Sequence, residues 1–284
     1  WSMNVMIIKY LTAYFPPIAL AGIRLTIASA LLLPLAVRRH GLVKLPAGAW
    51  LQIAAVAFFS IFLHQITLTF GLSMTSATHT IIILSLIPPF TTIAASRFVN
   101  EPLNRNKIAS LVLGISGVLL IVTPAGNAKA STFMGDGVIL LSAIAYVIGS
   151  LYVKKSTAST PLLVLTTYSH LFASLALLLI GCAVNDTWFY PEAFSFWPLF
   201  LLLFSALVCT ALGALCWNTG TKIIGASQTS LFLNIHPIVG LFASALLLGE
   251  KLTWQHYASL TLVVIGISLG TGIYTLLVKP QPGE

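Results

Sequence analysis

The stretch "TIIILSLIPPFTTIAA", residues 80–95, is almost wholly apolar, yet it carries two prolines, Pro88 and Pro89, at its centre. A proline inside a helix removes one backbone hydrogen bond and clashes with the carbonyl four residues earlier, at a cost of about 3 kcal/mol or more. A segment with the length and composition of one continuous helix therefore contains an interruption, and the interruption needs a physical reason.

The composition places the chain in a lipid bilayer. Charged residues make up 7% of the 284 residues and hydrophobic residues 58%, whereas a soluble domain has about 25% charged residues. The formal net charge is +8, but the basic residues stand singly or in pairs between apolar runs, as in membrane proteins. We therefore expect a multi-pass membrane protein and no nucleic-acid partner.

Ten segments approach the roughly 20 apolar residues that a spanning helix needs. A first segment ends near Tyr14, and the others cover about 16–38, 47–70, 78–99, 106–123, 134–152, 160–184, 196–219, 226–249 and 254–277. The first is short, because Pro16 follows it and the sequence opens at Trp1, so we expect the start of helix one to be missing. We expect no cleavable signal peptide.

Lysine and arginine are distributed unequally between the links. One set of alternate links and the C-terminal end hold Arg38, Arg39, Lys44, Arg97, Arg105, Lys107, Lys154, Lys155, Lys222 and Lys279. The opposite links hold only Lys9, Lys129 and Lys251. By the positive-inside rule, both termini are expected in the cytoplasm. The link at 184–197, "VNDTWFYPEAFSFW", has acids and aromatics but no lysine or arginine, as expected of an external loop.

The proline segment has a second copy 149 residues later. "ATHTIIILSLIPPF" (77–90) aligns with "ASQTSLFLNIHPIV" (226–239), and 14 of the 50 positions in 71–120 are identical to those in 220–269. A weaker match with a shift of 145 places Pro16 over Pro161. Since each copy holds five helices, an odd number, the second copy must cross the membrane in the opposite sense.

These observations predict the fold class. We expect an all-α membrane protein of ten transmembrane helices in two inverted five-helix repeats, at 1–123 and 134–277, with a cytoplasmic tail at 278–284. Inverted repeats of this kind are typical of secondary transporters, and helices interrupted at equivalent positions indicate a binding site near the midplane. Pro88 and Pro237 are the expected conformational hinges; the alternative is that both are packing kinks.

The chain resembles the EamA family of the drug/metabolite transporter superfamily. The resemblance rests on "WSMNVMIIKYL…PPIALAGIRLTIA", on "RFVNEPLNRNKIASLVLGISGVLLIV" after the proline-centred helix, and on "LLLGEKLTWQHYASLTLVVIGI" in the second half. It implies ten helices and the export of small metabolites across a bacterial inner membrane, with the aromatic-amino-acid exporters as the nearest likeness. The related sugar-phosphate carriers need cations in their site, and only Lys9 and Arg24 are candidates here. We therefore expect a zwitterion or an apolar cation rather than a dianion.

Aromatic and polar side chains within the expected helices suggest a substrate site. Any one of them taken alone could simply form a hydrogen bond between helices. Together they would form an apolar pocket with a few polar anchors. The predicted substrate-binding residues are Trp1, Asn4, His64, His79, Ser85, Tyr146, Trp217 and Asn234. Neither a metal nor a cofactor is expected, because the three cysteines lie in or beside apolar runs without metal-ligand spacing.

Arg24 lies within an expected helix, where a charge is costly and often functional. It could meet a substrate carboxylate, or it could bind helix-end carbonyls or reach the interface; the resemblance favours this structural role, since the family has arginine here across varied substrates. All six acids are expected in links or at helix ends, and Glu101 and Glu250 precede helix starts, where negative charge is favourable. Without a buried acid, only histidine could relay protons, so we expect gradient-driven flux.

Other functions remain open. Efflux of hydrophobic or cationic drugs and proton coupling through histidine are alternatives within the transporter class. A channel would need a ring of repeated polar residues, and an enzyme would need a paired acid and base or an HExxH motif; neither pattern is present. The GxxxG pattern at 266–270 permits close helix contact within the bundle or across a dimer, so we expect a monomer or a weak homodimer.

Overall fold

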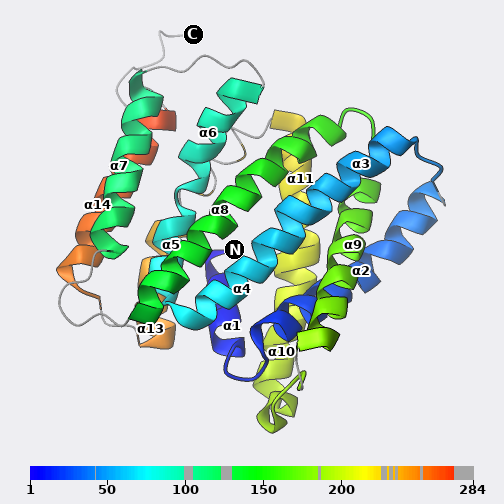
Figure 1. Ribbon diagram of the computed structural model, residues 1–284, viewed down its shortest axis with the longest axis horizontal. Helices are drawn as coiled ribbons and strands as arrows, with labels where there is room; N and C mark the ends of the chain where they lie inside the picture. Colours follow the sequence, from blue (N-terminus) through cyan, green and yellow to red (C-terminus); the bar gives the residue numbers. More distant parts are fainter. Residues whose placement is uncertain are drawn as a thin grey trace, which may run out of the picture.

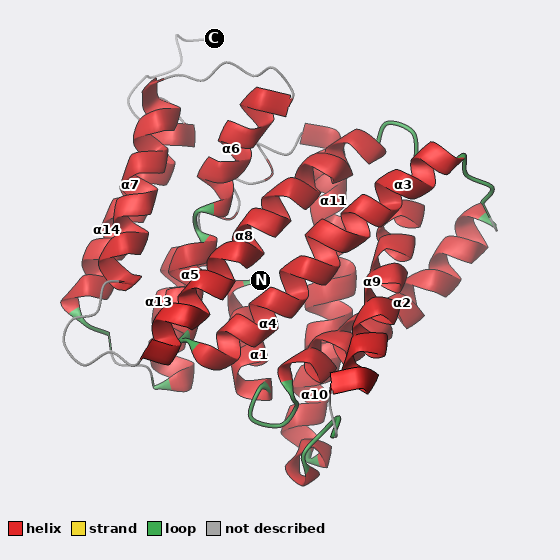
Figure 2. Cartoon of the chain, viewed as in Figure 1, coloured by secondary structure: helices red, strands yellow, loops and turns green. Residues whose placement is uncertain are grey.

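The computed structural model describes residues 1–41, 43–98, 105–122, 130–184, 187–224, 229, 233, 236–249 and 252–271. All regular elements in these ranges are helices (Figure 2). In chain order they are α1 (Ser2–Leu11), α2 (Pro17–His40), α3 (Ala47–Val56), η1 (Ala57–Leu63), α4 (His64–Met74), α5 (Ala77–Leu84), α6 (Ile87–Phe98), α7 (Arg105–Val122), α8 (Ala130–Ser156), α9 (Leu162–Val184), η2 (Pro191–Phe194), α10 (Phe196–Phe204), η3 (Ser205–Leu212), α11 (Gly213–Ile224), α13 (His236–Leu248) and α14 (Trp254–Thr271).

The all-helical membrane architecture predicted from composition is confirmed. Six helical stretches of the described chain are long and apolar enough to cross a bilayer: Pro17–His40, Ala47–Met74, Ala77–Phe98, Phe133–Ser156, Leu162–Val184 and Phe196–Ile223. Two shorter apolar helices, Ile108–Leu120 and His236–Leu248, accompany them. Large apolar side chains remain exposed on the outer surfaces of these helices, as is normal where the surroundings are lipid rather than water.

One hydrophobic core joins both halves of the sequence. Its largest cluster brings α1, α4 and α5 of the first half together with α8, α10 and α14 of the second; typical members are Ile8, Leu72, Ile82, Ile139 and Val263. Figure 1 shows α8, in green, running between α5 and α4, which belong to the first half. The two halves therefore interlock, and a cavity at the centre of the bundle is bordered by both.

Equivalent helices of the two halves also pack on each other in pairs: α2 lies against α9, and α7 lies against α14 (Figure 1). In the second pair, Gly117 and Gly266 occupy equivalent places. A Cβ on Gly266 would lie 2.9 Å from the carbonyl oxygen of Ser110, and one on Gly117 would lie 3.0 Å from that of Ser259. Gly266, the first glycine of the GxxxG pattern, thus serves close packing inside the bundle.

The prolines of the opening stretch begin a helix. α5 ends at Leu84, residues 85–86 form a turn, and α6 begins at Ile87, so Pro88 and Pro89 occupy its first turn. The first N–H groups of a helix have no intrahelical partner, and proline loses nothing by lacking one there. The expected single segment 78–99 is therefore two helices, and the interruption precedes Pro88 instead of lying at it.

Two π-helical segments are features that the sequence analysis missed. η1 lies between α3 and α4, and η3 lies between α10 and α11. Adding the repeat shift of 149 to 57–63 gives 206–212, which falls within η3 at 205–212. The same rare backbone irregularity thus occurs at equivalent places in the two halves. π-helical turns are frequent at functional sites.

We predict that Gly149 in α8 cannot carry a side chain. A Cβ at this position would collide with the backbone nitrogen and the Cβ of Ser60 in η1. Gly149→Ala should overpack this contact at a cost of about 1–3 kcal/mol and lower the thermal unfolding midpoint in detergent by several degrees. Gly137→Ala is the control, because the same helix has nothing within 4 Å of that position. Equal midpoints for the two variants would contradict the prediction.

Candidate functional site

A central cavity is lined by both halves of the chain, and the irregular segments border it. Its wall is formed by Trp1, Asn4, Val5, Ile8, Val56, Ser60, Ile61, His64, Gln65, Leu68, Leu84, Ile87, Tyr146, Val153, His170, Cys209, Thr210, Ala214, Trp217, Asn218, Leu233 and His236. Ser60 and Ile61 belong to η1, Cys209 and Thr210 to η3, and Leu84 and Ile87 flank the break between α5 and α6. The cavity thus lies where the backbone departs from regular helix.

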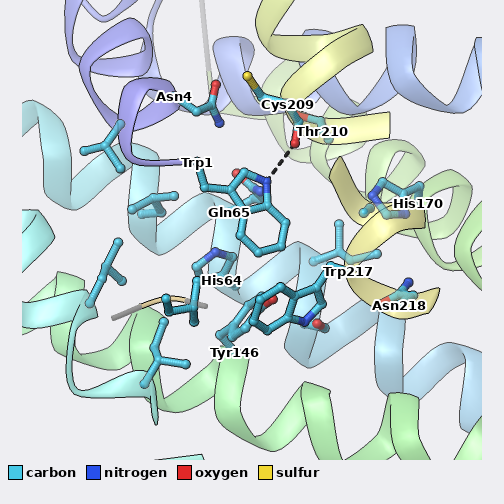
Figure 3. A pocket seen from close by; sticks show the side chains of 18 of the residues that line it. Trp1, Asn4, His64, Gln65, Tyr146, His170, Cys209, Thr210, Trp217 and Asn218 are labelled. Carbon is cyan, nitrogen blue, oxygen red and sulfur yellow. Dashed lines mark hydrogen bonds between the residues drawn. The ribbon is translucent and has the colours of Figure 1, made fainter. Parts of the chain in front are cut away.

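Three aromatic rings form one side of the cavity (Figure 3). The ring centroids of Trp1 and Trp217 are 4.9 Å apart and tilted by 46°, and Tyr146 lies 6.4 Å from Trp1 and 6.3 Å from Trp217. The indole N–H of Trp1 donates to the carbonyl oxygen of Cys209 at 2.8 Å. These rings from α8, α11 and the start of the chain offer flat apolar surfaces for a planar or apolar group.

Polar groups on the cavity wall are held by neighbouring side chains. His64 packs its ring 4.9 Å from that of Tyr146, and its Nδ1 lies 2.8 Å from the hydroxyl of Ser142. The amide of Asn218 donates to the hydroxyl of Thr166 at 2.9 Å. Because these bonds fix the side chains, the cavity presents a defined set of polar atoms on an otherwise apolar surface, the usual form of a small-molecule site.

The structure brings five of the predicted site residues together: Trp1, Asn4, His64, Tyr146 and Trp217 line the cavity. Ser85 and His79 are not among the lining residues. Ser85 is buried in the turn before α6, and its hydroxyl donates to the carbonyl of Ile82. Asn234 lies outside the described residues.

His79 takes part in a separate polar cluster that ties several helices together. Its Nδ1 lies 2.9 Å from Oδ2 of Asp136, and the hydroxyl of Thr75 donates to Oδ1 at 2.5 Å. The ammonium of Lys9 donates to the carbonyl oxygens of Leu72 and Thr75 at 2.8 and 2.7 Å. The cluster joins α1, the end of α4 with the link that follows it, α5, and the early part of α8.

The position of Asp136 contradicts one prediction. The sequence predicts all acids in links or at helix ends, but Asp136 lies inside α8 and is only 2% exposed. The sequence showed both His79 and Asp136 but could not show that they meet, since 57 residues separate them.

Among the described residues, no group of three or more histidines, cysteines or acids could hold a metal ion.

Arg24 also differs from its expected structural role. Its side chain is 1% exposed, so it does not reach the interface, and its donors meet the hydroxyls of Ser205 and Thr210 instead of helix-end carbonyls. Its partners, which the sequence did not reveal, are therefore two hydroxyl residues of η3.

His170 of α9 also lines the cavity, although it was not among the predicted site residues.

The family comparison agrees with this arrangement. The model of the EamA-like transporter family matches residues 1–123 and 133–271. The chain belongs to the EamA-like transporter family. It is accordingly a multi-pass membrane transporter, which works in a lipid bilayer on a small-molecule substrate.

Relatives of this EamA-like chain are also transporters. It is 27% identical to "Uncharacterized transporter YyaM" of Bacillus subtilis, over 93% of this chain and 88% of the relative. It is 27% identical to a "Probable amino-acid metabolite efflux pump" of Salmonella typhimurium, over 94% and 89% of the two chains. A protein of known crystal structure shares the fold, with a TM-score of 0.70 over 96% of each chain at 14% identity.

The pairing of His79 with Asp136 predicts a stability effect. Asp136→Asn should lower the thermal unfolding midpoint, because hydrogen bonds to a charged group contribute about 1.5–3 kcal/mol each. Glu192→Gln, at an exposed acid, is the matched control and should leave the midpoint unchanged. The double variant His79→Gln/Asp136→Asn should lose less than the sum of the single losses. Strict additivity in this cycle would show that the two side chains do not interact.

Proposed function

We propose that the chain exports small metabolites, with aromatic or other neutral amino acids as the favoured substrates, across the inner membrane of a bacterium. The observation that carries this proposal is the central cavity, whose wall combines three aromatic rings with amide, hydroxyl and imidazole groups. An aromatic side chain would stack on the rings, and the amino and carboxylate groups would meet the polar atoms.

The charge of the wall narrows the substrate class further. Among the described residues that line the cavity there is no Asp, Glu, Lys or Arg, which supports a substrate of low net charge over a dianion. The printed names of relatives in Salmonella typhimurium and Escherichia coli, both probable amino-acid metabolite efflux pumps, support an amino acid over an unrelated drug. Efflux of a lipophilic cation would instead call for an acid in the wall.

The cavity must open wider to admit such a substrate. Its volume of about 120 Å³ is below the ~300–1,000 Å³ of typical ligand pockets. In our proposal helices contributed by both halves move against one another and expose the cavity to one side of the membrane at a time. Pro88 and Pro237, each the second residue of its helix, would be the points at which α6 and α13 pivot.

We further propose ten transmembrane helices in two inverted five-helix repeats, with both termini in the cytoplasm. The separate family matches to 1–123 and 133–271 support the repeat. The placement of basic links supports the orientation: the α2–α3 and α8–α9 links and the end of α6 lie along the upper edge of Figure 1, whereas the α1–α2 link and the start of α10 lie at its lower edge.

Cysteine labelling tests this topology. After Cys182, Cys209 and Cys216 are replaced by alanine, Arg39→Cys should react only with membrane-permeant maleimide in intact cells. Glu192→Cys should react with an impermeant maleimide added outside. The motivation is the concentration of lysine and arginine in alternate links. Labelling of both positions from the same side would disprove the proposed topology.

The driving force is proposed to be the gradient of the substrate itself, since no acid is found in the part of the cavity wall that the structure describes. A second candidate, exchange of substrate for protons, is favoured by one specific observation: the pair formed by the half-buried His79 and the buried Asp136. Buried acids and histidines in membrane proteins often form proton relays. The pair does not line the cavity, so we retain gradient-driven flux as the first proposal.

Flux in proteoliposomes tests substrate and coupling together. We expect tryptophan efflux down its gradient that a protonophore leaves unchanged. Trp217→Ala should raise the half-saturation concentration about tenfold by removing an aromatic stacking surface. Trp254→Ala, at a residue 68% exposed on α14, should transport like the wild type. Uphill accumulation driven by an imposed pH gradient would support the proton-coupled alternative, and equal losses in the two tryptophan variants would place the site elsewhere.

A further inference from the structure

The guanidinium of Arg24 is a buried cation without an acidic partner among the described residues. Its Nε donates to the hydroxyl of Ser205 at 2.8 Å and its Nη2 donates to the hydroxyl of Thr210 at 3.0 Å. Its Nη1 is buried and has no hydrogen-bond partner. A buried charge paired only with neutral groups is destabilising by several kcal/mol, and such an unsatisfied group calls for an explanation.

The direction of the hydrogen bonds from Arg24 determines what the cavity wall presents. An arginine can only donate, so the oxygen of Ser205 accepts from Nε, and the Ser205 proton is free to be donated onward. It goes to Oδ1 of Asn4 at 2.6 Å. With its oxygen used, Asn4 is left with its N–H donors for the cavity that it lines.

Thr210 completes this polar wall. Its hydroxyl accepts from Arg24 of α2 and donates to the carbonyl oxygen of Ser205 within η3 at 2.9 Å, so its proton is already used. Both Asn4 and Thr210 line the cavity (Figure 3). The wall therefore offers the N–H donors of Asn4 in front of a fixed positive charge, and among the described residues that line the cavity there is no acid to neutralise that charge.

We propose that the cavity binds the carboxylate group of its substrate at Asn4, and that Arg24, from behind this wall, is a positioning residue that orients Asn4 and supplies the counter-charge. This inference rests on the proposed function and narrows it to molecules that carry a carboxylate. A carboxylate accepts from the amide of Asn4 and offsets the unpaired charge of Arg24. A primary amide of the same shape can accept through its carbonyl oxygen but carries no negative charge to offset that of Arg24, and an ammonium group does neither.

Matched pairs of ligands test this inference without requiring transport. The purified full-length chain is titrated with tryptophan, phenylalanine, leucine and threonine and with the amide of each, and ligand-induced thermal stabilisation is measured. For at least one pair we expect the acid to bind about tenfold or more tightly than its amide, as is usual for a hydrogen bond to a charged group. If no acid is preferred to its amide, the proposal is overturned.

Variants separate a positioning role from a merely structural one. Arg24→Gln should bring the acid-to-amide ratio close to one, whereas Arg24→Lys should restore part of it. Arg38→Gln, at an exposed arginine of the same helix, is the control and should keep the ratio of the wild type. If Arg24→Gln weakens acid and amide equally, Arg24 acts only on packing and the proposal fails.

Asn4→Asp keeps the test decisive if Arg24→Gln does not fold. The new carboxylate should repel an acid and lower its affinity at least tenfold, while the affinity for the amide changes little. An unchanged acid-to-amide ratio in this variant would place the carboxylate elsewhere. Loss of the proposed export function would have a different signature, namely no flux in proteoliposomes with the preference for acids intact.

Discussion

The hydrocarbon of a bilayer offers no hydrogen bonds, so each backbone N–H and C=O within it must find a partner inside the protein. Most of this chain meets the requirement with regular helix, and the irregular segments gather around one cavity. Side chains there donate hydrogen bonds to backbone carbonyl oxygens. The indole of Trp1 donates to the carbonyl of Cys209, the hydroxyl of Thr210 to the carbonyl of Ser205, and the hydroxyl of Ser85 to the carbonyl of Ile82. The position of the cavity follows from this constraint, because irregular backbone is tolerated only where protein groups or a wet space can satisfy it.

The two halves share backbone irregularities but support them with different side chains. η1 is packed closely against Gly149 of α8, whereas η3 is held by the guanidinium of Arg24. Under the proposed alternating mechanism, similar backbones would keep two conformations near each other in free energy. The unequal side chains would then decide which conformation prevails, and they give the cavity one tightly packed wall and one polar wall.

Much of this arrangement could be predicted from the sequence, because long apolar runs and a repeat are patterns of composition. The aromatic residues of the cavity were also predictable, since Tyr146 and Trp217 lie within expected helices and Trp1 opens the first one. The π-helices were not. "AFFSIFL" and "SALVCTAL" contain neither proline nor glycine, and a widened turn in an apolar helix is decided by its neighbours. The pairing of His79 with Asp136 was hidden for the same reason, as it depends on how α5 packs against α8.

That packing also bears on how a proton could influence transport. Asp136 and the cavity residue Tyr146 lie ten positions apart on α8, which is about 15 Å along a helix. His79 precedes Leu84 by five positions on α5, or about 7.5 Å. Direct electrostatic contact between this pair and a substrate is therefore weak. A proton bound at the pair acts on the cavity only if it moves α5 against α8, which requires two discrete packings of these helices. α5 is also packed against α1, α7, α13 and α14, so such a displacement would have to be shared with these neighbours.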